Sequence, residues 1–372
     1  MSDPHTPHRT YQSISGDVEK QLLDQLAELS EGSRLTPISE QSEEAWCNET
    51  VQAFELMAAT EREMALLLAD VQAGEPVSTE PLDLSIAKLN VSLATDPEAL
   101  LSLSLLRTFD GEGFDHTINV SVYMMALGRG LELPDQQVIL LGKGGLLHDV
   151  GKVRLPQSLI NKTTPLDLND LRFIKDHVRL TLDSLSRMEA LPPEIMRLVA
   201  EHHERLDGSG YPSGLKGDQI SPYGRIAAIC DCFDAMTSKR SYRRAKTGKQ
   251  VLRELVQEGR ERGTLDVKMV ELFIRVVGIY PVGSLVRLAD GHLGVVMRNN
   301  PRDLLHPTIK LVAKGENNLI MTPQRLDLAR HRDDEKLRIV GTESPAATRI
   351  DPLAFLPAAH LFVPNKTGYG LA

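Results

Sequence analysis

The sequence has few cysteines and no long apolar run. Its three cysteines, Cys47, Cys230 and Cys232, are odd in number and too few for a disulfide framework. No stretch approaches the roughly 18 uncharged residues of a membrane-spanning helix, so we expect no membrane insertion. The polar residues 1–11 lack the apolar centre of a secretory signal. Together these absences predict a cytoplasmic protein.

The charged residues are unevenly distributed along the 372-residue chain. The formal net charge is −9, and residues 1–107 contain 19 acidic but only 6 basic side chains. Such an acidic segment would repel a phosphate backbone, so we expect no nucleic-acid partner. Between Ala235 and Arg253 the sequence has several bases and no acid. Taken alone, that pattern is typical of a solvated helix face.

Changes in hydrophobic period divide the chain into five parts. Residues 1–13 are expected to form a flexible arm. Residues 14–100 have the apolar spacing of a helical regulatory or dimerisation domain, through which a homodimer could form. Residues 101–280 remain helical, and residues 281–330 change to the short runs of a small β subdomain. Residues 331–372 form a tail with no clear period.

The β subdomain is predicted from short apolar runs around turn residues. Asp290-Gly291 separates two runs within residues 283–297, which is typical of a hairpin. A third run covers Thr308 to Val312, and a fourth covers residues 319–321. We therefore predict a mainly α fold with a small C-terminal β subdomain.

The helical middle of the chain contains groups that can bind metal ions. His148-Asp149 follows an apolar helix, and the two oxygens of a carboxylate can bridge two ions, although a histidine capping a buried turn would give the same pattern. Lys152 lies on the same helical face as His148, where it could meet a phosphate. Glu112 and His116 are spaced i, i+4, which directs both side chains toward one place on a helix.

Other candidates are less specific when each is taken alone. His177 lies in a charged helix and is by itself typical of a surface histidine. Asp231 and Asp234 interrupt the apolar helix 226–236, and buried carboxylates need a cation or hydrogen-bond partners. A structural salt bridge is the alternative for either aspartate.

The most specific pattern is HHERLDGSGYP at residues 202–212. Two adjacent histidines close a helix and lead into a glycine-rich loop that ends in Gly-Tyr-Pro. With the other motifs in the same order, the chain resembles the HD-GYP family, a branch of the HD metal-dependent phosphohydrolases that hydrolyses cyclic di-GMP. The resemblance covers residues 109–279 and implies a helical HD-type phosphohydrolase core with its catalytic domain at residues 101–280.

The resemblance implies a site for two or three divalent metal ions. The family's metal ligands fall on Glu112, His116, His148, Asp149, His177, His202, His203 and Asp231. Asp149 is expected to bridge two ions, and Glu112 occupies the place of a ligand to a third. Mixed histidine and carboxylate ligands suit iron or manganese.

The resemblance also implies how the substrate is bound and cleaved. Asp149 and Lys152 are expected to be catalytic, because two ions can share a hydroxide aimed at phosphorus while Lys152 contacts the scissile phosphate. Tyr211 would touch the substrate. Arg240 and Arg243, from the Arg-x-Tyr-Arg motif, would bind the second phosphate. The expected products are pGpG and, with a third ion, GMP.

Three positions depart from the family pattern without removing a ligand. Val178 and Thr181 stand where the family usually has proline and glycine, and Ser241 replaces the proline of Arg-Pro-Tyr-Arg. We therefore expect an active cyclic di-GMP phosphodiesterase. The alternatives are an HD phosphohydrolase for another cyclic dinucleotide and a receptor or docking module without turnover. A cyclase or regulator could dock at the Gly-Tyr-Pro loop.

Overall fold

The computed structural model describes residues 43–75, 78–107, 115–160, 162, 164, 167–188, 191–238, 246–315 and 318–356. The described helices are α2 (Glu43–Ala73), α3 (Glu80–Thr95), α4 (Pro97–Arg107), α5 (Asp115–Gly130), α6 (Asp135–Leu147), α7 (Gln157–Ile160), α8 (Leu168–Lys175), α9 (His177–Leu185), α10 (Pro193–Glu201), α11 (Pro222–Thr237), α12 (Gly248–Arg260), α13 (Val267–Val277) and α14 (Pro345–Thr348). The strands are β1 (Leu285–Leu288), β2 (Leu293–Arg298), β3 (Thr308–Lys314), β4 (Leu319–Asp327) and β5 (Ile339–Glu343).

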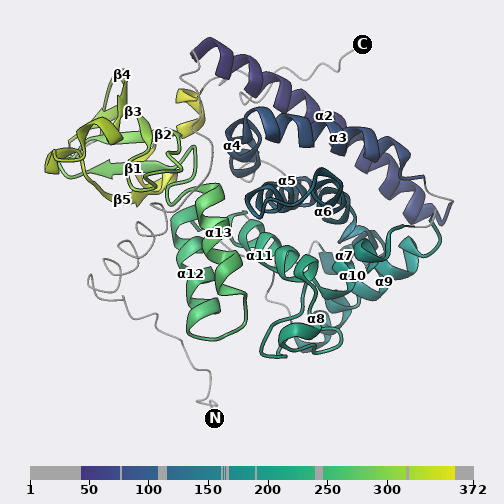
Figure 1. Ribbon diagram of the computed structural model, residues 1–372. Helices are drawn as coiled ribbons and strands as arrows, with labels where there is room; N and C mark the ends of the chain where they lie inside the picture. Colours follow the sequence, from purple (N-terminus) through teal and green to yellow (C-terminus); the bar gives the residue numbers. More distant parts are fainter. Residues whose placement is uncertain are drawn as a thin grey trace.

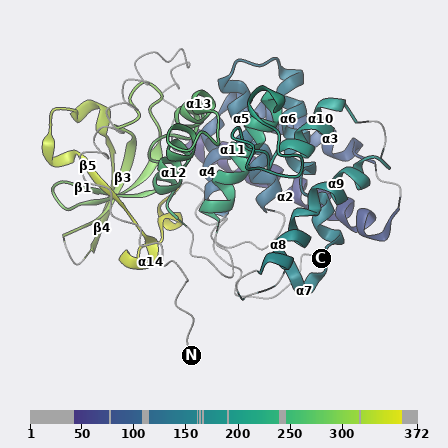
Figure 2. The ribbon, with the colours of Figure 1, turned by 90° about the horizontal axis from the view of Figure 1, so that it is seen from below.

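A helical body and a small sheet lie side by side. In Figure 1, α2 and α3 run along the outside of the body, and the sheet lies at the opposite end. Figure 2 shows the same order from below, with α12 and α13 between the sheet and the helices α5 and α11. The prediction of a mainly α fold with a small C-terminal β subdomain is therefore confirmed. The predicted arm at residues 1–13 and the helical pattern before residue 43 lie outside the described residues.

The sheet is antiparallel throughout and has the strand order β4-β3-β2-β1-β5. The predicted hairpin is confirmed: Leu285 pairs with Val295, and Gly291 in the turn has a φ of 87°. The third predicted strand is β3, and the fourth is β4, which is longer than its apolar run indicated. β5 lies in the tail that showed no clear period, and it pairs with β1. Its pairing partner lies about fifty residues earlier, which a local pattern cannot reveal.

One hydrophobic core joins most of the described elements. It extends from Ala53 in α2, through the central helices, to Ile339 in β5. The helices α2, α3 and α4 thus bury their apolar faces in the same core as α5 and α6. Polar contacts add to this packing, because Lys143 of α6 lies 2.6 Å from the Asp83 carboxylate of α3. The segment expected to be regulatory is therefore packed directly on the central helices.

A close contact between α5 and α6 brings two site-bearing segments together. A Cβ on Gly145 would lie 2.6 Å from the Cα of Ser121, so only glycine permits this approach. The Ser121 hydroxyl donates a hydrogen bond to the carbonyl of Gly142 at 2.8 Å. Because His116 lies in the first turn of α5 and His148 follows α6, this contact brings the two histidines closer together.

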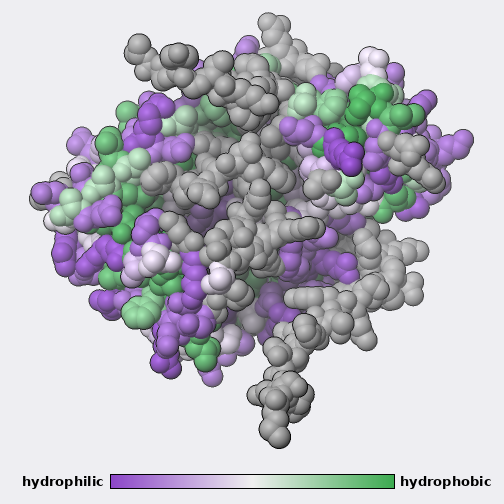
Figure 3. Space-filling model, turned by 180° about the vertical axis from the view of Figure 1, so that it is seen from behind, coloured by the Kyte–Doolittle hydropathy of each residue, from purple (hydrophilic) through white to green (hydrophobic). Residues whose placement is uncertain are grey.

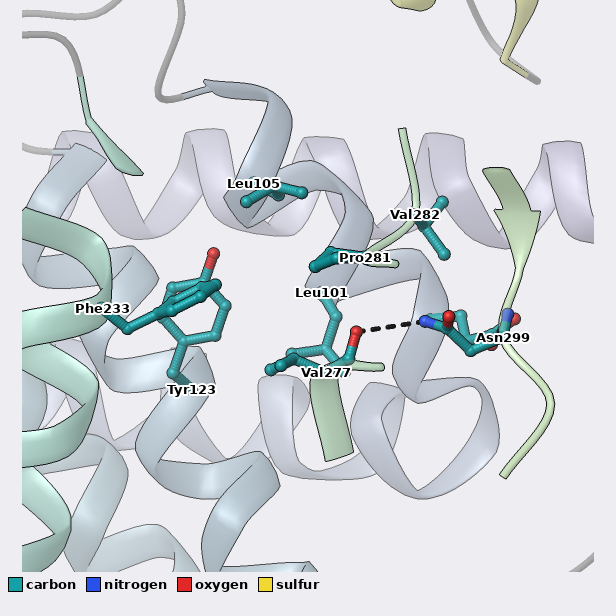
Figure 4. A pocket seen from close by; sticks show the side chains of 9 residues that line it. Leu101, Leu105, Tyr123, Phe233, Val277, Pro281, Val282 and Asn299 are labelled. Carbon is teal, nitrogen blue, oxygen red and sulfur yellow. Dashed lines mark hydrogen bonds between the residues drawn. The ribbon is translucent and has the colours of Figure 1, made fainter. Parts of the chain in front are cut away.

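The helical body contacts the sheet through a buried polar cluster beside a small cavity. Glu98 of α4 accepts a hydrogen bond from the backbone N–H of Asn299 at 2.7 Å and lies 3.1 Å from Arg298. Figure 4 shows Tyr123 and Phe233 on one side of the cavity, and Asn299 donating to the Val277 carbonyl on the other. The cluster fixes the end of β2 against α4.

Within the described residues, no helix combines the length and apolar character needed to cross a membrane. The face seen in Figure 3 carries hydrophilic side chains interrupted by small hydrophobic areas.

The buried Glu98 carboxyl predicts a dependence of stability on pH. Burial raises the pKa of Glu98 from 4.5 to about 8, although Arg298 opposes this shift. The folded state then keeps a proton that the unfolded state releases, so this group lowers the free energy of unfolding as the pH rises from about 4.5 to 8. In Glu98→Gln, which cannot ionise, we expect a flatter pH dependence in urea denaturation. The exposed Glu335→Gln is the control, and an unchanged Glu98→Gln profile would contradict this assignment.

Candidate functional site

Candidate metal ligands from five separate segments meet at one place. His116 lies in the first turn of α5, His148 and Asp149 follow α6, and His177 begins α9. His202 and His203 follow α10, and Asp231 lies in α11. These seven residues were predicted as ligands, and the structure brings all of them together. The eighth, Glu112, lies outside the described residues.

Three of the histidines have the same local geometry. Each imidazole approaches, through Nδ1, the backbone carbonyl three residues earlier in the last turn of a helix. The pairs are His148 with Gly145 at 2.7 Å, His177 with Ile174 at 2.6 Å, and His202 with Val199 at 2.7 Å. Because a carbonyl oxygen only accepts, Nδ1 must donate a proton, which leaves a lone pair on Nε2 of a neutral ring. Three helix ends therefore each present one Nε2 to the site.

Asp149 lies in the middle of these nitrogens. Its Oδ2 is 3.2 Å from Nε2 of His148 and 3.5 Å from Nε2 of His116. Its Oδ1 is 3.2 Å from Nε2 of His177 and 4.0 Å from that of His202. The two carboxylate oxygens thus face two different sets of imidazoles, the arrangement of a carboxylate placed between two cations.

The ligand atoms form groups of the size that a metal ion requires. Within each group all ligand atoms lie within 4.8 Å of one another, and the groups are His177, His202 and His203; His116, His148 and Asp231; and His148, Asp149 and His202. The Nε2 atoms of His177 and His202 are 3.4 Å apart. Two nitrogens at this distance need a proton or a metal ion between them. Buried Nε2 of His148 and Oδ1 of Asp149 also have no hydrogen-bond partner. The residues therefore fit a multinuclear metal site.

The ionisation of the site also suits cation binding. Burial alone would raise the pKa of Asp149, but His148, Lys152 and His116 hold it well below its usual value. Asp231 behaves in the same way, because its hydrogen bond with His116 and nearby histidines outweigh burial. Both aspartates therefore stay charged, and a charged pair in a buried site needs a compensating cation.

Three of the site histidines differ in the direction in which their surroundings shift the pKa. Burial lowers the pKa of His203 to about 3, and burial together with the neighbouring histidines also lowers that of His202. Burial opposes protonation of His116 as well, but hydrogen bonds to Asp149, Asp231 and Asp234 raise its pKa well above the usual value. His202 and His203 are thus neutral at physiological pH and have lone pairs available, and His116 holds the proton that a metal ion would displace.

Asp234 positions His116, a role that the sequence did not assign to it. Its Oδ2 lies 2.6 Å from Nδ1 of His116, and its Oδ1 accepts a hydrogen bond from Asn119 at 3.1 Å. The hydroxyl of Ser238 donates to Oδ2 at 3.1 Å. Asp234 is completely buried. A carboxylate on the outer nitrogen of a histidine fixes the orientation of the ring, so the salt-bridge alternative describes Asp234. Asp231 also lies within ion-pair distance of histidines, 3.3 Å from His116 and 3.5 Å from His203, and stays a candidate ligand.

The Gly-Tyr-Pro loop is held against the histidines by Glu204. The Glu204 carboxylate accepts N–H groups of Ser213, Gly214 and Leu215 at 2.7, 3.1 and 3.0 Å. A Cβ on Gly210 would lie 2.4 Å from the Cα of Glu204, so the loop can pack here only with glycine at this position.

Tyr211 lies against His203 of the candidate metal site. Its ring centroid is 4.6 Å from that of His203, with an angle of 30° between the planes. Burial and the carboxylates Asp231 and Asp149 raise the pKa of Tyr211, so its hydroxyl remains a hydrogen-bond donor. The predicted substrate contact is therefore placed at the edge of the histidine cluster.

Lys152 and the altered α9 positions lie beside Asp149. The ammonium of Lys152 contacts Asp149, and its side chain is 37% exposed while that of Asp149 is only 4% exposed. Lys152 can therefore meet both the carboxylate and a bound ligand. The Thr181 hydroxyl accepts the backbone N–H of Gly151 at 3.0 Å. Val178 is completely buried in α9, which begins at His177, and Thr181 joins α9 to the Lys152 turn.

The remaining predicted residues include two that the structure does not describe. Arg240 and Arg243, expected to bind a second phosphate, lie outside the described residues, as does Ser241. Cys230 is buried in the hydrophobic core, and half-buried Cys232 accepts a hydrogen bond from Arg205 at 3.1 Å.

Comparisons with known proteins show what the chain is similar to. Residues 93–267 match the family model described as HD domain. The cyclic di-GMP phosphodiesterase PA4108 of Pseudomonas aeruginosa is 35% identical over 281 residues, 76% of this chain and 67% of that protein. The 3'3'-cGAMP-specific phosphodiesterase 2 of Vibrio cholerae is 37% identical over 161 residues, 43% of this chain and 30% of that protein. The structure of Bd1817, an HDG"Y"P protein from Bdellovibrio bacteriovorus, has a TM-score of 0.48 and 15% identity, and the match covers 69% of this chain and 78% of that one.

Asp234 can be tested through metal retention. Asp234→Asn keeps a hydrogen-bonding side chain but removes the negative charge beside His116. We expect metal affinity to fall about 10- to 100-fold, the usual effect of losing such a partner. Metal content per chain, measured after dialysis against graded chelator concentrations, checks this, with the exposed Asp218→Asn as the control. Equal retention by both variants would show that Asp234 does not position His116.

Glu204 can be tested through the stability of the loop it holds. Glu204→Ala leaves three N–H groups without their acceptor, so we expect the free energy of unfolding to fall by about 1–3 kcal/mol. Amide hydrogen exchange should also accelerate at residues 213–215. The exposed Glu335→Ala provides the control. Unchanged exchange at these three amides would contradict the proposed anchoring.

Proposed function

The chain belongs to the HD-domain family, in its HD-GYP branch of cyclic di-GMP phosphodiesterases, and on this premise we propose that it hydrolyses cyclic di-GMP to pGpG and onward to GMP. The observation that carries the proposal is the convergence of six candidate ligands around a seventh, Asp149, whose two oxygens face separate groups of imidazoles. The relative PA4108 is itself named a cyclic di-GMP phosphodiesterase.

We propose that the site holds iron or manganese, because both metals accept mixed histidine and carboxylate ligands. His177, His202 and His203 would hold one ion, His116, His148 and Asp231 a second, and Asp149 would lie between them. Glu112 would serve a third ion. Bound divalent ions would supply Lewis-acid chemistry, which lowers the pKa of water and neutralises charge on phosphate.

The chain's own residues would bind and orient the substrate. Lys152 is partly exposed beside Asp149, so its ammonium can contact an oxygen of the scissile phosphate. Tyr211 can donate its hydroxyl hydrogen to the same ligand, and its ring forms one wall of the site. Arg240 and Arg243 would bind the second phosphate. Burial of the ligand histidines limits the entry of bulk water and strengthens each of these electrostatic contacts.

A second candidate substrate is 3'3'-cGAMP. Relatives in Vibrio cholerae that are named 3'3'-cGAMP-specific phosphodiesterases are 36% and 37% identical to parts of this chain. A cyclic dinucleotide with one adenine has the same phosphodiester groups, so the metal site would treat both alike, and any preference would come from contacts with the base. A receptor without turnover is the third candidate.

We also propose a role for each part of the chain. We assign catalysis to residues 101–280, regulation or dimerisation to residues 14–100, and a structural role to residues 281–330. Docking of a cyclase or regulator would involve the Gly-Tyr-Pro loop.

The proposal is tested by hydrolysis assays on protein loaded anaerobically with ferrous iron or with manganese. We expect cyclic di-GMP turnover with two or three metals per chain, and loss of turnover in Asp149→Ala by at least about 100-fold. Asp218→Ala, at an exposed aspartate, should behave as wild type. Full metal loading and tight nucleotide binding without turnover would favour a receptor. Faster cleavage of 3'3'-cGAMP than of cyclic di-GMP would favour the second candidate.

A further inference from the structure

Lys175 places a positive charge one aromatic ring away from the candidate metal ligands. It is the last residue of α8, and its Nζ lies 4.8 Å from the centroid of the Tyr211 ring. The same ring lies 4.6 Å from His203 and 6.5 Å from His177, centroid to centroid. Lys175 is exposed, whereas His177, two residues later, is buried. The ammonium therefore lies at the rim of the site, on the side of the Gly-Tyr-Pro loop.

Lys175 differs from its neighbours in having an aromatic partner in place of a carboxylate. Lys162 pairs with Asp170, and Arg179 pairs with both carboxylate oxygens of Asp176. For Lys175, the described part of the chain offers no carboxylate within ion-pair distance, only the Tyr211 ring. A cation–π contact at an exposed position is weak, and an ammonium has three N–H donors. An anionic ligand could therefore replace the ring as the partner of the ammonium, and the loss of interaction free energy would be small.

The helix that carries Lys175, α8, makes few buried contacts with the rest of the protein. None of the eight residues of α8 is buried. Its start is fixed by Asp167, whose carboxylate accepts the N–H groups of Asn169 and Asp170 at 2.8 and 2.9 Å. With few buried contacts, such a helix can adjust to a ligand without disturbing the core. Its last residue can therefore follow a ligand bound at Tyr211.

A cyclic dinucleotide has a second phosphodiester, which Arg240 and Arg243 are proposed to bind, and a further cation at this rim would share that charge. The metal ligands with Lys152 can serve only the phosphodiester being cleaved. Lys152 is already engaged with Asp149. We propose that Lys175 is a further substrate-binding residue. Its ammonium moves away from the Tyr211 ring and binds an oxygen of the phosphodiester that is not being cleaved. This inference rests on the proposed function.

The test compares a substrate that has a second phosphodiester with one that has none. In Lys175→Met we expect the KM for cyclic di-GMP to rise about 10-fold, the effect of losing one charge-assisted hydrogen bond, with kcat changed less than about 2-fold. Hydrolysis of bis(p-nitrophenyl) phosphate, which has a single phosphodiester, should be unchanged. Lys175→Arg should restore most of the affinity. Raising the salt concentration should increase the KM for cyclic di-GMP more in wild type than in Lys175→Met. The exposed Lys268→Met in α13 is the matched control.

The outcomes separate this inference from the proposed function. An unchanged KM for cyclic di-GMP in Lys175→Met would overturn it. Equal losses with both substrates, or lost metal, would overturn it too, because Lys175 would then act by positioning Tyr211 and His203. If wild type cleaves bis(p-nitrophenyl) phosphate but not cyclic di-GMP, the proposed function fails. In that case the role of Lys175 is tested by calorimetric binding of cyclic di-GMP to wild type and to Lys175→Met. Equal affinities would overturn that role.

Discussion

The architecture of the site depends on hydrogen bonds between histidine Nδ1 and the free carbonyls of helix ends. The last four carbonyls of a helix have no partner within it, and at α6, α8 and α10 a histidine just beyond the helix satisfies one of them. The same bond fixes the ring and, when the ring is neutral, leaves the lone pair on Nε2. Helix C-termini also carry partial negative charge, which favours cations. One local interaction, used three times, therefore caps the helices, orders the ligands and prepares the site electrostatically.

This use of helix ends determines how the helices must pack. Nitrogens from three helix ends can meet around one carboxylate only if the helices converge, and α5 must come close enough to add His116. The contact at Gly145 permits that approach. Asp234, Asn119 and Ser238 then hold the outer side of His116 inside the core, where an unpaired carboxylate would be strongly destabilising. Packing of the core and geometry of the site are thus set by the same contacts.

Local patterns in the sequence predicted the parts of this structure that depend on neighbours in the chain. The helical character of the described residues before 100, the Asp290-Gly291 hairpin and the helix ends at His148 and His202 all follow from apolar period and turn residues. The convergence of the ligands was predicted from family resemblance, since spacing alone left each histidine open to a structural interpretation. Pairing of β5 with β1, the bond between Asp234 and His116, and the anchoring of the loop by Glu204 involve partners that no local period reveals.

The shared core gives the first described helices a physical route to the site. The helices α2, α3 and α4 are packed with α5 and α6 in one hydrophobic cluster, and Glu98 joins α4 to the sheet through Arg298 and Asn299. Close-packed interiors transmit displacement because they contain little free volume. A rearrangement of α4 would therefore move its neighbour α5, and with it His116, whose distance from Asp149 and Asp231 is only 3.3 to 3.5 Å. A shift of α5 would therefore alter the geometry of the candidate ligands directly.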